Sequence, residues 1–186
     1  MKIKLFILSI IAILGLSACA NDTSQEDNNA NSSSKETMNH EEMNHTGSGE
    51  IPEGLKVAEN PVYKVGSKAI IKADHMEGMK GAEATIVGAY DTIAYVVSYT
   101  PTTGGEMVTN HKWVIQEEIK DAGTEEIASG TEVTLEADHM EGMKGATAEI
   151  ESAEKTTVYV VDYTPTTGGE KVTNHKWVTE SELSDK

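Results

Sequence analysis

The chain has 186 residues, a formal net charge of −16 at pH 7 and a single cysteine. So acidic a chain is repelled by phosphate backbones, which excludes nucleic acid as a partner. One cysteine excludes an internal disulfide, so the fold must be held by its core or by a bound ligand.

The first 18 residues have the features of a bacterial signal peptide. A short basic region precedes an apolar run from Leu5 to Leu16, which is too short for a comfortable membrane span. The run ends in Leu-Ser-Ala-Cys at 16–19, which resembles a lipobox. We expect cleavage before Cys19, lipid attachment to its sulfur, and anchoring to the extracellular face of the cell membrane. An ordinary signal peptide with an incidental cysteine is the alternative.

Residues 19–60 are expected to form a lipidated, disordered tether. The first thirty of them are rich in Asn, Ser, Asp and Glu and have almost no large aliphatic side chains. Ile51–Leu55 is expected to lead into the folded part. A Met-Asn-His motif occurs twice within the tether, which makes four residues candidates for additional copper ligands: Met38, His40, Met43 and His45. Chance clustering in a low-complexity segment is the alternative.

The rest of the chain is a tandem repeat, which we place at 61–122 and 123–186. Aligning 66–116 with 130–180 gives 33 identical residues out of 51, at a constant offset of 64. Apolar and polar positions alternate over 69–73, 82–87 and 95–99, as expected for half-buried β-strands.

A Pro-Thr-Thr-Gly-Gly turn leads into a fourth predicted strand, Val108 to Ile115. Residues 116–119 and 180–183 are expected to form a helical turn followed by a last short strand. The pattern predicts a mainly β fold, a monomer with two tandem small SH3-like β-barrels. An OB-like barrel is the alternative.

The segment Asp-His-Met-Glu-Gly-Met-Lys-Gly occurs at 74–81 and again, unchanged, at 138–145. One imidazole and two thioethers in a tight loop are ligands that favour Cu(I) over harder ions. Strand four adds a His to each copy, and a Trp whose ring could supply a cation–π contact, Trp113 or Trp177. The predicted metal ligands are His75, Met76, Met79, His111, His139, Met140, Met143 and His175.

Other roles for these residues stay open. The methionines could be apolar filler, the strand-four histidines could satisfy backbone groups, and the tryptophans could serve packing. The identity of the loops favours a functional role, because outward strand positions differ between the copies. Met107 is excluded because its counterpart is Lys171.

The lipobox, the Met/His tether and the tandem Ala-Asp-His-Met-x-Gly-Met-Lys-Gly and Asn-His-Lys-Trp signatures together resemble the YdhK-type surface lipoproteins of Gram-positive bacteria. The chain is also similar to a staphylococcal copper-binding lipoprotein that accompanies a copper-exporting P-type ATPase. That resemblance implies a role in copper resistance, with such an ATPase as a partner.

These observations predict an extracellular, membrane-anchored protein that buffers Cu(I). A cell-wall or glycan-binding module is the alternative, with Tyr95, Tyr99 and Trp113 and their copies as contacts. An enzyme is not expected, because the sequence has no motif for a Ser or Cys nucleophile and no carboxylate pair in a recognisable catalytic frame.

Overall fold

The computed structural model describes residues 47–186, and this part is mainly β, as predicted. The two repeats have the same succession of elements, a short strand, a very long strand, a medium strand and a 3-10 turn. In chain order the elements are β1 (Lys56–Val57), β2 (Lys68–Ile71), β3 (Glu83–Tyr99), β4 (Val108–Ile115), η1 (Gln116–Glu118), β5 (Glu132–Thr134), β6 (Thr147–Tyr163), β7 (Val172–Thr179), η2 (Glu180–Glu182) and β8 (Leu183–Ser184).

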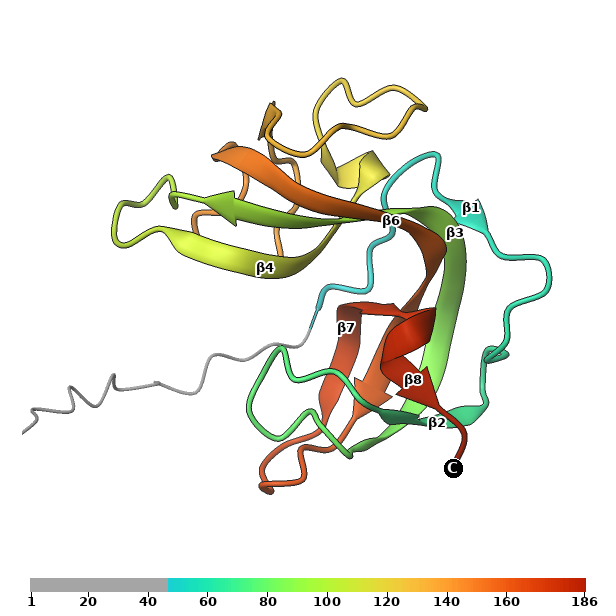
Figure 1. Cartoon of the computed structure of the whole chain (residues 1–186). Helices are drawn as coiled ribbons and strands as arrows, with labels where there is room; N and C mark the ends of the chain where they lie inside the picture. Colours follow the sequence, from blue (N-terminus) through green and yellow to red (C-terminus); the bar gives the residue numbers. More distant parts are fainter. Residues whose placement is uncertain (1–46) are drawn as a thin grey trace, which may run out of the picture. The chain divides into compact units, whose positions relative to one another are not determined.

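The long strands β3 and β6 form the centre of the fold and pair antiparallel along their whole length (Figure 1). Ala84 lies opposite Tyr163, and Ala148 lies opposite Tyr99. Adding the offset of 64 to Ala84 and subtracting it from Tyr163 gives the second pair, so the two repeats are related by an internal pseudo-twofold axis. The register shift near Gly88 has its counterpart at the other end of the pairing, between Val96 and Val97.

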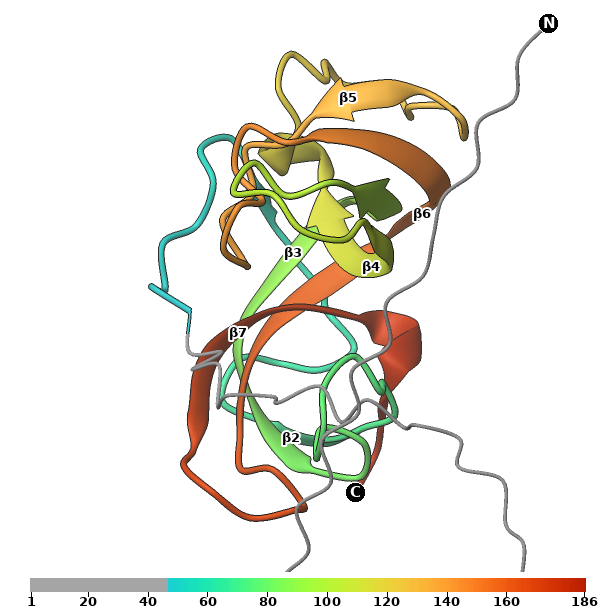
Figure 2. The ribbon, with the colours of Figure 1, turned by 90° about the vertical axis from the view of Figure 1, so that its left-hand side faces the viewer.

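The two halves of each long strand belong to different apolar clusters, which define two lobes (Figure 2). In what we call the Met79 lobe, β2, residues 83–89, residues 158–163 and β7 lie side by side, and β8 pairs with β2. The Met143 lobe repeats this plan with β5, residues 147–153, residues 93–99 and β4, and an Ile119–Leu135 bridge takes the place of the last pairing.

Each lobe thus groups short strand segments around one apolar cluster, as predicted for a single repeat, but half of these segments come from each repeat. The Met79 cluster combines Ile71 and Ile86 with Tyr159 and Val161, and the Met143 cluster combines residues of both repeats in the same way. The two repeats lie where the sequence places them, but 61–122 and 123–186 do not each form a separate barrel, because each core takes residues from both.

The exchange has a physical cause in the segment between the predicted second and third strands. These are one continuous strand, β3, because residues 89–94 contain no Gly or Pro to make a tight hairpin. The corresponding residues 153–158 contain none either. A strand that cannot turn back continues into the neighbouring lobe and pairs there with the other repeat.

A third apolar cluster lies between the lobes and includes both tryptophans, Trp113 and Trp177. Ile51 and Leu55 pack against it, as expected for a segment that leads into the fold. β1 pairs with β3, so the predicted tether boundary at residue 60 is too late, and the chain already contacts the fold from Gly47. Within 47–186, no helix is long and apolar enough to cross a membrane.

Strand four and the helical turns were predicted correctly. β4 spans Val108–Ile115, and the 3-10 turns η1 and η2 follow β4 and β7. The short last strand is present as β8 after η2, and as the single Ile119–Leu135 bridge after η1.

Candidate metal site

Each His-Met-Met loop is held by the Pro-Thr-Thr-Gly-Gly turn of the other repeat. The backbone N–H of Thr166 donates to the carbonyl of Gly78 at 2.9 Å, and that of Thr102 donates to Gly142 at 2.8 Å. Gly78 has a φ of +74°, and a Cβ there would lie 2.8 Å from the Cβ of Pro165. Only glycine fits this position, so docking of the turn explains part of the identity between the two loops.

His75 is positioned by a buried carboxylate from the end of the other repeat. Its Nε2 lies 2.7 Å from Oε1 of Glu182 in η2. The Trp113 indole N–H donates to Oε2 of the same carboxylate at 2.8 Å, and the backbone N–H of Thr179 donates at 3.1 Å. Burial acts to raise the pKa of Glu182, but the hydrogen bond and charge of His75, with these N–H groups, hold it below its usual value.

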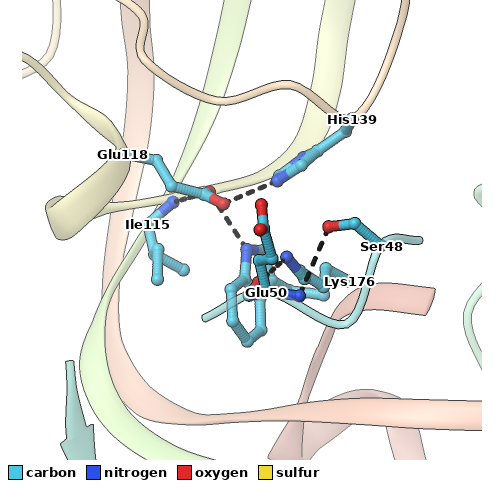
Figure 3. A network of polar contacts seen from close by, with 7 residues as sticks. Ser48, Glu50, Ile115, Glu118, His139 and Lys176 are labelled. Carbon is cyan, nitrogen blue, oxygen red and sulfur yellow. Dashed lines mark hydrogen bonds and ion pairs between the residues drawn. The ribbon is translucent and has the colours of Figure 1, made fainter. Parts of the chain in front are cut away.

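The same network is repeated around His139, as Figure 3 shows. His139 Nε2 lies 2.7 Å from Oε1 of Glu118 in η1. Trp177 donates its indole N–H to Oε2 at 3.0 Å, and Ile115 donates its backbone N–H at 3.2 Å. In both networks the His and Trp belong to one repeat and the Glu to the other, so neither network exists within a single repeat.

Sequence reasoning missed Glu118 and Glu182, although a signal was present. The two residues stand 64 apart, and they are unchanged although the two residues before them differ, Gln-Glu in one copy and Glu-Ser in the other. In a chain with 31 acidic residues, a Glu in a polar turn is read as solvated. The Glu118 side chain is only 6% exposed.

A cluster of two imidazoles, one thioether and one phenol lies in the Met143 lobe. The ring centres of His111 and His139 are 6.2 Å apart, and those of Tyr99 and His111 are 5.9 Å apart with the rings nearly perpendicular. The Tyr99 hydroxyl donates to the sulfur of Met140 at 3.8 Å. The predicted ligands His111 and His139 are therefore brought together across the two repeats rather than within one, and Tyr99 lies in contact with both His111 and Met140.

Two nitrogens of this cluster, Nε2 of His111 and Nδ1 of His139, are buried and have no hydrogen-bond partner within residues 47–186. Burial, with smaller contributions from the nearby His139 and His75, lowers the pKa of His111 to about 4 against the opposing effect of Glu118. His111 is thus a neutral imidazole at physiological pH, the form that binds metal ions.

The Met79 lobe has the equivalent residues. Tyr163 and His175 are in edge contact with ring centres 5.8 Å apart, matching Tyr99 and His111. Nδ1 of His75 is buried with no hydrogen-bond partner in the described part of the chain. Met76 is partly buried at the edge of the apolar cluster, as Met140 is in the other lobe.

Other predicted site residues are placed differently. Met79 and Met143 are fully buried inside the two apolar clusters, which favours their interpretation as packing residues. The tryptophan rings contact the ammonium groups of their neighbours Lys112 and Lys176, at 5.2 and 5.8 Å from the ring centres. The remaining candidates lie outside the described residues: Cys19, Met38, His40, Met43 and His45.

Within residues 47–186, no group of three or more His, Cys, Asp and Glu side chains is arranged to hold a metal ion.

The exchanged strands and paired His–Glu–Trp networks define a class of protein in which two repeats share both lobes. The chain belongs to the family described as "Protein of unknown function (DUF1541)", which it matches over residues 65–116 and 129–180. It is 63% identical over 185 residues to the uncharacterized protein YdhK of Bacillus subtilis strain 168, covering 100% of this chain and 90% of that protein.

Solved structures of that relative share the fold. A 2.00 Å crystal structure of the B. subtilis DUF1541 protein YdhK is 71% identical with a TM-score of 0.76, and covers 79% of this chain and 100% of that one. A solution NMR structure of the YdhK C-terminal domain is 74% identical with a TM-score of 0.63, covering 66% of this chain and 93% of that one.

Proposed function

We propose that this protein binds Cu(I) at two sites, each formed across the repeats. The observation that carries the proposal is the cluster of His111, His139 and Met140 in the Met143 lobe. It combines two imidazoles with buried, unpartnered nitrogens and one thioether. Two nitrogens and one sulfur suit Cu(I) better than Zn(II), Mg(II) or Ca(II). His75, His175 and Met76 form the equivalent set in the Met79 lobe.

The distance between the two imidazoles is compatible with one shared ion. A bond between a metal and an imidazole nitrogen is about 2 Å long. Ring centres separated by 6.2 Å therefore leave room for an ion between one nitrogen of each ring. His139 and its carboxylate partner Glu118 are 12% and 6% exposed, so the site lies just below the surface, where an ion can enter.

The expected location of the protein is part of the proposal. The lipobox ending at Cys19 supports anchoring to the outer face of the cell membrane, where a protein that binds Cu(I) lowers the free concentration before the ion enters the cell. We propose that it contributes to copper resistance in this way, and that it acts beside a copper-exporting ATPase. The Met/His motif of the tether would supply a second, weaker set of ligands.

Glycan binding has less support. The aromatic side chains expected to contact a wall polymer are buried, Tyr95 at 0%, Tyr99 at 1% and Trp113 at 6% exposure. Carbohydrate-binding aromatic rings must face solvent to stack on a sugar, so these three are not placed for that role.

A pair of methionine variants in the same loop tests the copper site. Met140→Leu removes a proposed ligand, and Met143→Leu changes a packing residue, both with nearly conserved volume. We expect Met140→Leu to weaken Cu(I) binding at least about tenfold, in anaerobic competition with a chromogenic chelator, and Met143→Leu to leave it unchanged. Equal affinity in Met140→Leu and the native protein would refute the site. A larger loss in Met143→Leu would mean that Met143 is the ligand and Met140 the packing residue.

A further inference from the structure

The contacts of Glu182 and Glu118 determine which nitrogen of the neighbouring histidine carries a proton. An ionised carboxylate only accepts hydrogen bonds. Glu182 accepts from the Trp113 indole and the Thr179 amide, and its Oε1 lies 2.7 Å from Nε2 of His75. Nε2 of His75 must then be the donor, because two acceptors would repel each other at this distance.

The other nitrogen of the ring follows from this assignment. In a neutral imidazole only one nitrogen is protonated, so a proton on Nε2 leaves a lone pair on Nδ1. Nδ1 is the atom that is buried without a hydrogen-bond partner in the described part of the chain, in His75 and in His139. An N–H group in that position would be a buried donor without an acceptor, which is unfavourable. A lone pair there is available to a metal ion.

We propose that Glu118 and Glu182 are positioning residues that hold His139 and His75 as Nε2–H tautomers, so that Nδ1 is the copper ligand of each ring. The inference rests on the proposed function for its metal, but the tautomer is a property of the metal-free protein. A metal-bound histidine commonly donates its second N–H to a carboxylate, which orients the ring and raises its basicity. Here the carboxylate is itself held by an indole and a backbone amide.

The exchange of strands between the repeats brings each carboxylate to its histidine. Glu118 ends the first repeat and orients a histidine of the second, and Glu182 ends the second repeat and orients a histidine of the first. Each metal site therefore requires both copies. The two sites form together when β3 and β6 pair, and neither is complete in one repeat.

The tautomers are measured directly in the metal-free mature chain, with Cys19→Ser to keep it soluble. Long-range ¹H–¹⁵N NMR correlations distinguish Nε2–H, Nδ1–H and doubly protonated rings. At neutral pH we expect Nε2–H for both His75 and His139. The proposal would be overturned, before any variant is made, if both rings were doubly protonated or if both were Nδ1–H tautomers.

The variant Glu118→Gln then tests the positioning role. We expect the indole and backbone donors to retain the amide oxygen, so that the amide NH₂ faces His139. His139 should change to the Nδ1–H tautomer, His75 should stay as it is, and Cu(I) affinity at that site should fall about 10–100-fold. Glu117→Gln is the matched control, because Glu117 accepts a hydrogen bond from Thr92 and contacts no histidine among the described residues.

The outcomes separate this inference from the proposed function. An unchanged His139 tautomer in Glu118→Gln would show that the carboxylate does not set it. A changed tautomer with undiminished Cu(I) affinity would show that Nδ1 is not the ligand. The expected tautomers in a native protein that binds no Cu(I) would refute the proposed function and leave the positioning of the rings standing. Glu182→Gln repeats the test in the other lobe if Glu118→Gln does not fold.

Discussion

The Met79 and Met143 lobes have the same strand arrangement and nearly the same residues, and they differ in the segment of chain that covers each of them. One hydrogen bond is present in both lobes although its acceptor residue differs. Ser98 accepts a hydrogen bond from the backbone N–H of Asn110 at 3.1 Å, and its counterpart Asp162 accepts from Asn174 at 2.9 Å. Both asparagines have a positive φ, 52° and 53°, so the same backbone conformation in β4 and β7 is held by two different side chains.

The difference arises from the chain that precedes each repeat. Residues 47–51 lie along β7, where Gly47 donates its N–H to the carbonyl of Thr173 at 2.9 Å, and Lys176 donates to the carbonyl of Glu50 (Figure 3). The segment leading into the second repeat takes another course. It folds over Gln116, whose side-chain amide donates to three of its carbonyls, those of Ala122, Gly123 and Glu125.

Two identical histidines consequently have unequal surroundings. His175 on β7 is 7% exposed, while His111 on β4 is partly exposed. The tryptophans show the opposite order, because Trp177, 0% exposed, belongs to the His139 network of the Met143 lobe, and Trp113, 6% exposed, belongs to the His75 network of the Met79 lobe. The internal duplication thus gives two chemically matched candidate sites, and the neighbouring chain changes the exposure of their strand histidines. Because His111 is more exposed than His175, we expect the proposed Met143 site to exchange copper faster than the proposed Met79 site.

The largest effect should come from removing one of the two repeats. Deleting residues 123–186 takes Tyr159 and Val161 from one core and Leu135 and Ile150 from the other. A natural domain is stable by only about 5–15 kcal/mol, so loss of half of each core exceeds what the rest can supply. We expect the truncated chain to be unfolded as a monomer and to lose all Cu(I) binding, measured by NMR and chelator competition at low micromolar concentration. A folded monomer that keeps one site would contradict the shared-core interpretation.

Acid should destabilise the metal-free protein through His111. Its pKa is about 4 in the folded protein and 6.5 when unperturbed, so the unfolded chain takes up the proton first as the pH falls. Stability is therefore complete above pH 6.5, declines between pH 6.5 and 4, and changes no further below 4 through this residue. The loss is of the order of 3 kcal/mol. Denaturant unfolding from pH 7.5 to 4 should show a steeper decline in the native protein than in His111→Gln, and parallel curves would show that His111 does not cause it.

Replacing each tryptophan in turn tests a smaller difference between the two His–Glu–Trp networks. Replacing either by Phe removes one N–H donor from a buried carboxylate, at a cost of about 1–3 kcal/mol. Water can replace the lost N–H donor more easily at Glu182, whose side chain is 14% exposed, than at Glu118, whose side chain is 6% exposed. We expect Trp177→Phe to lower the free energy of unfolding by more than Trp113→Phe, measured by chemical denaturation. The reverse order would mean that solvent access does not distinguish the two networks.

Local features of the fold could be predicted from the sequence, and the pairing between repeats could not. The alternation in Val108–Ile115 and the turn residues around it located β4 correctly. The sequence predicted two strands where the structure has one, β3. The alternation of apolar and polar residues breaks between Gly88 and Ala94, where β3 passes from one lobe to the other. Nearly identical repeats give a strand equally good partners in its own copy and in the other, so the hydrophobic pattern cannot choose between them.

The geometry of the candidate site could be predicted only in part, for the same reason. His75, Met76 and His111 were identified by residue type, because few side chains bind soft metals. The arrangement of His111 beside His139, and of Glu118 beside His139, depends on the exchange and could not be derived from spacing within a repeat. Burial of Met79 was one of two interpretations that the sequence left open.

The smallest effect should come from uncovering β7. A chain lacking residues 20–50 loses the Gly47–Thr173 hydrogen bond and the contact of Lys176 with Glu50, for a cost of about 1 kcal/mol. His175 should then react with diethyl pyrocarbonate nearly as fast as His111, quantified by peptide mass spectrometry. The matched control lacks only residues 20–46 and keeps the contacts of Gly47 and Glu50, so His175 should stay protected in it. If the two truncated chains react alike at His175, the segment 47–50 does not limit access to that lobe, and the difference between the sites must come from β7 itself.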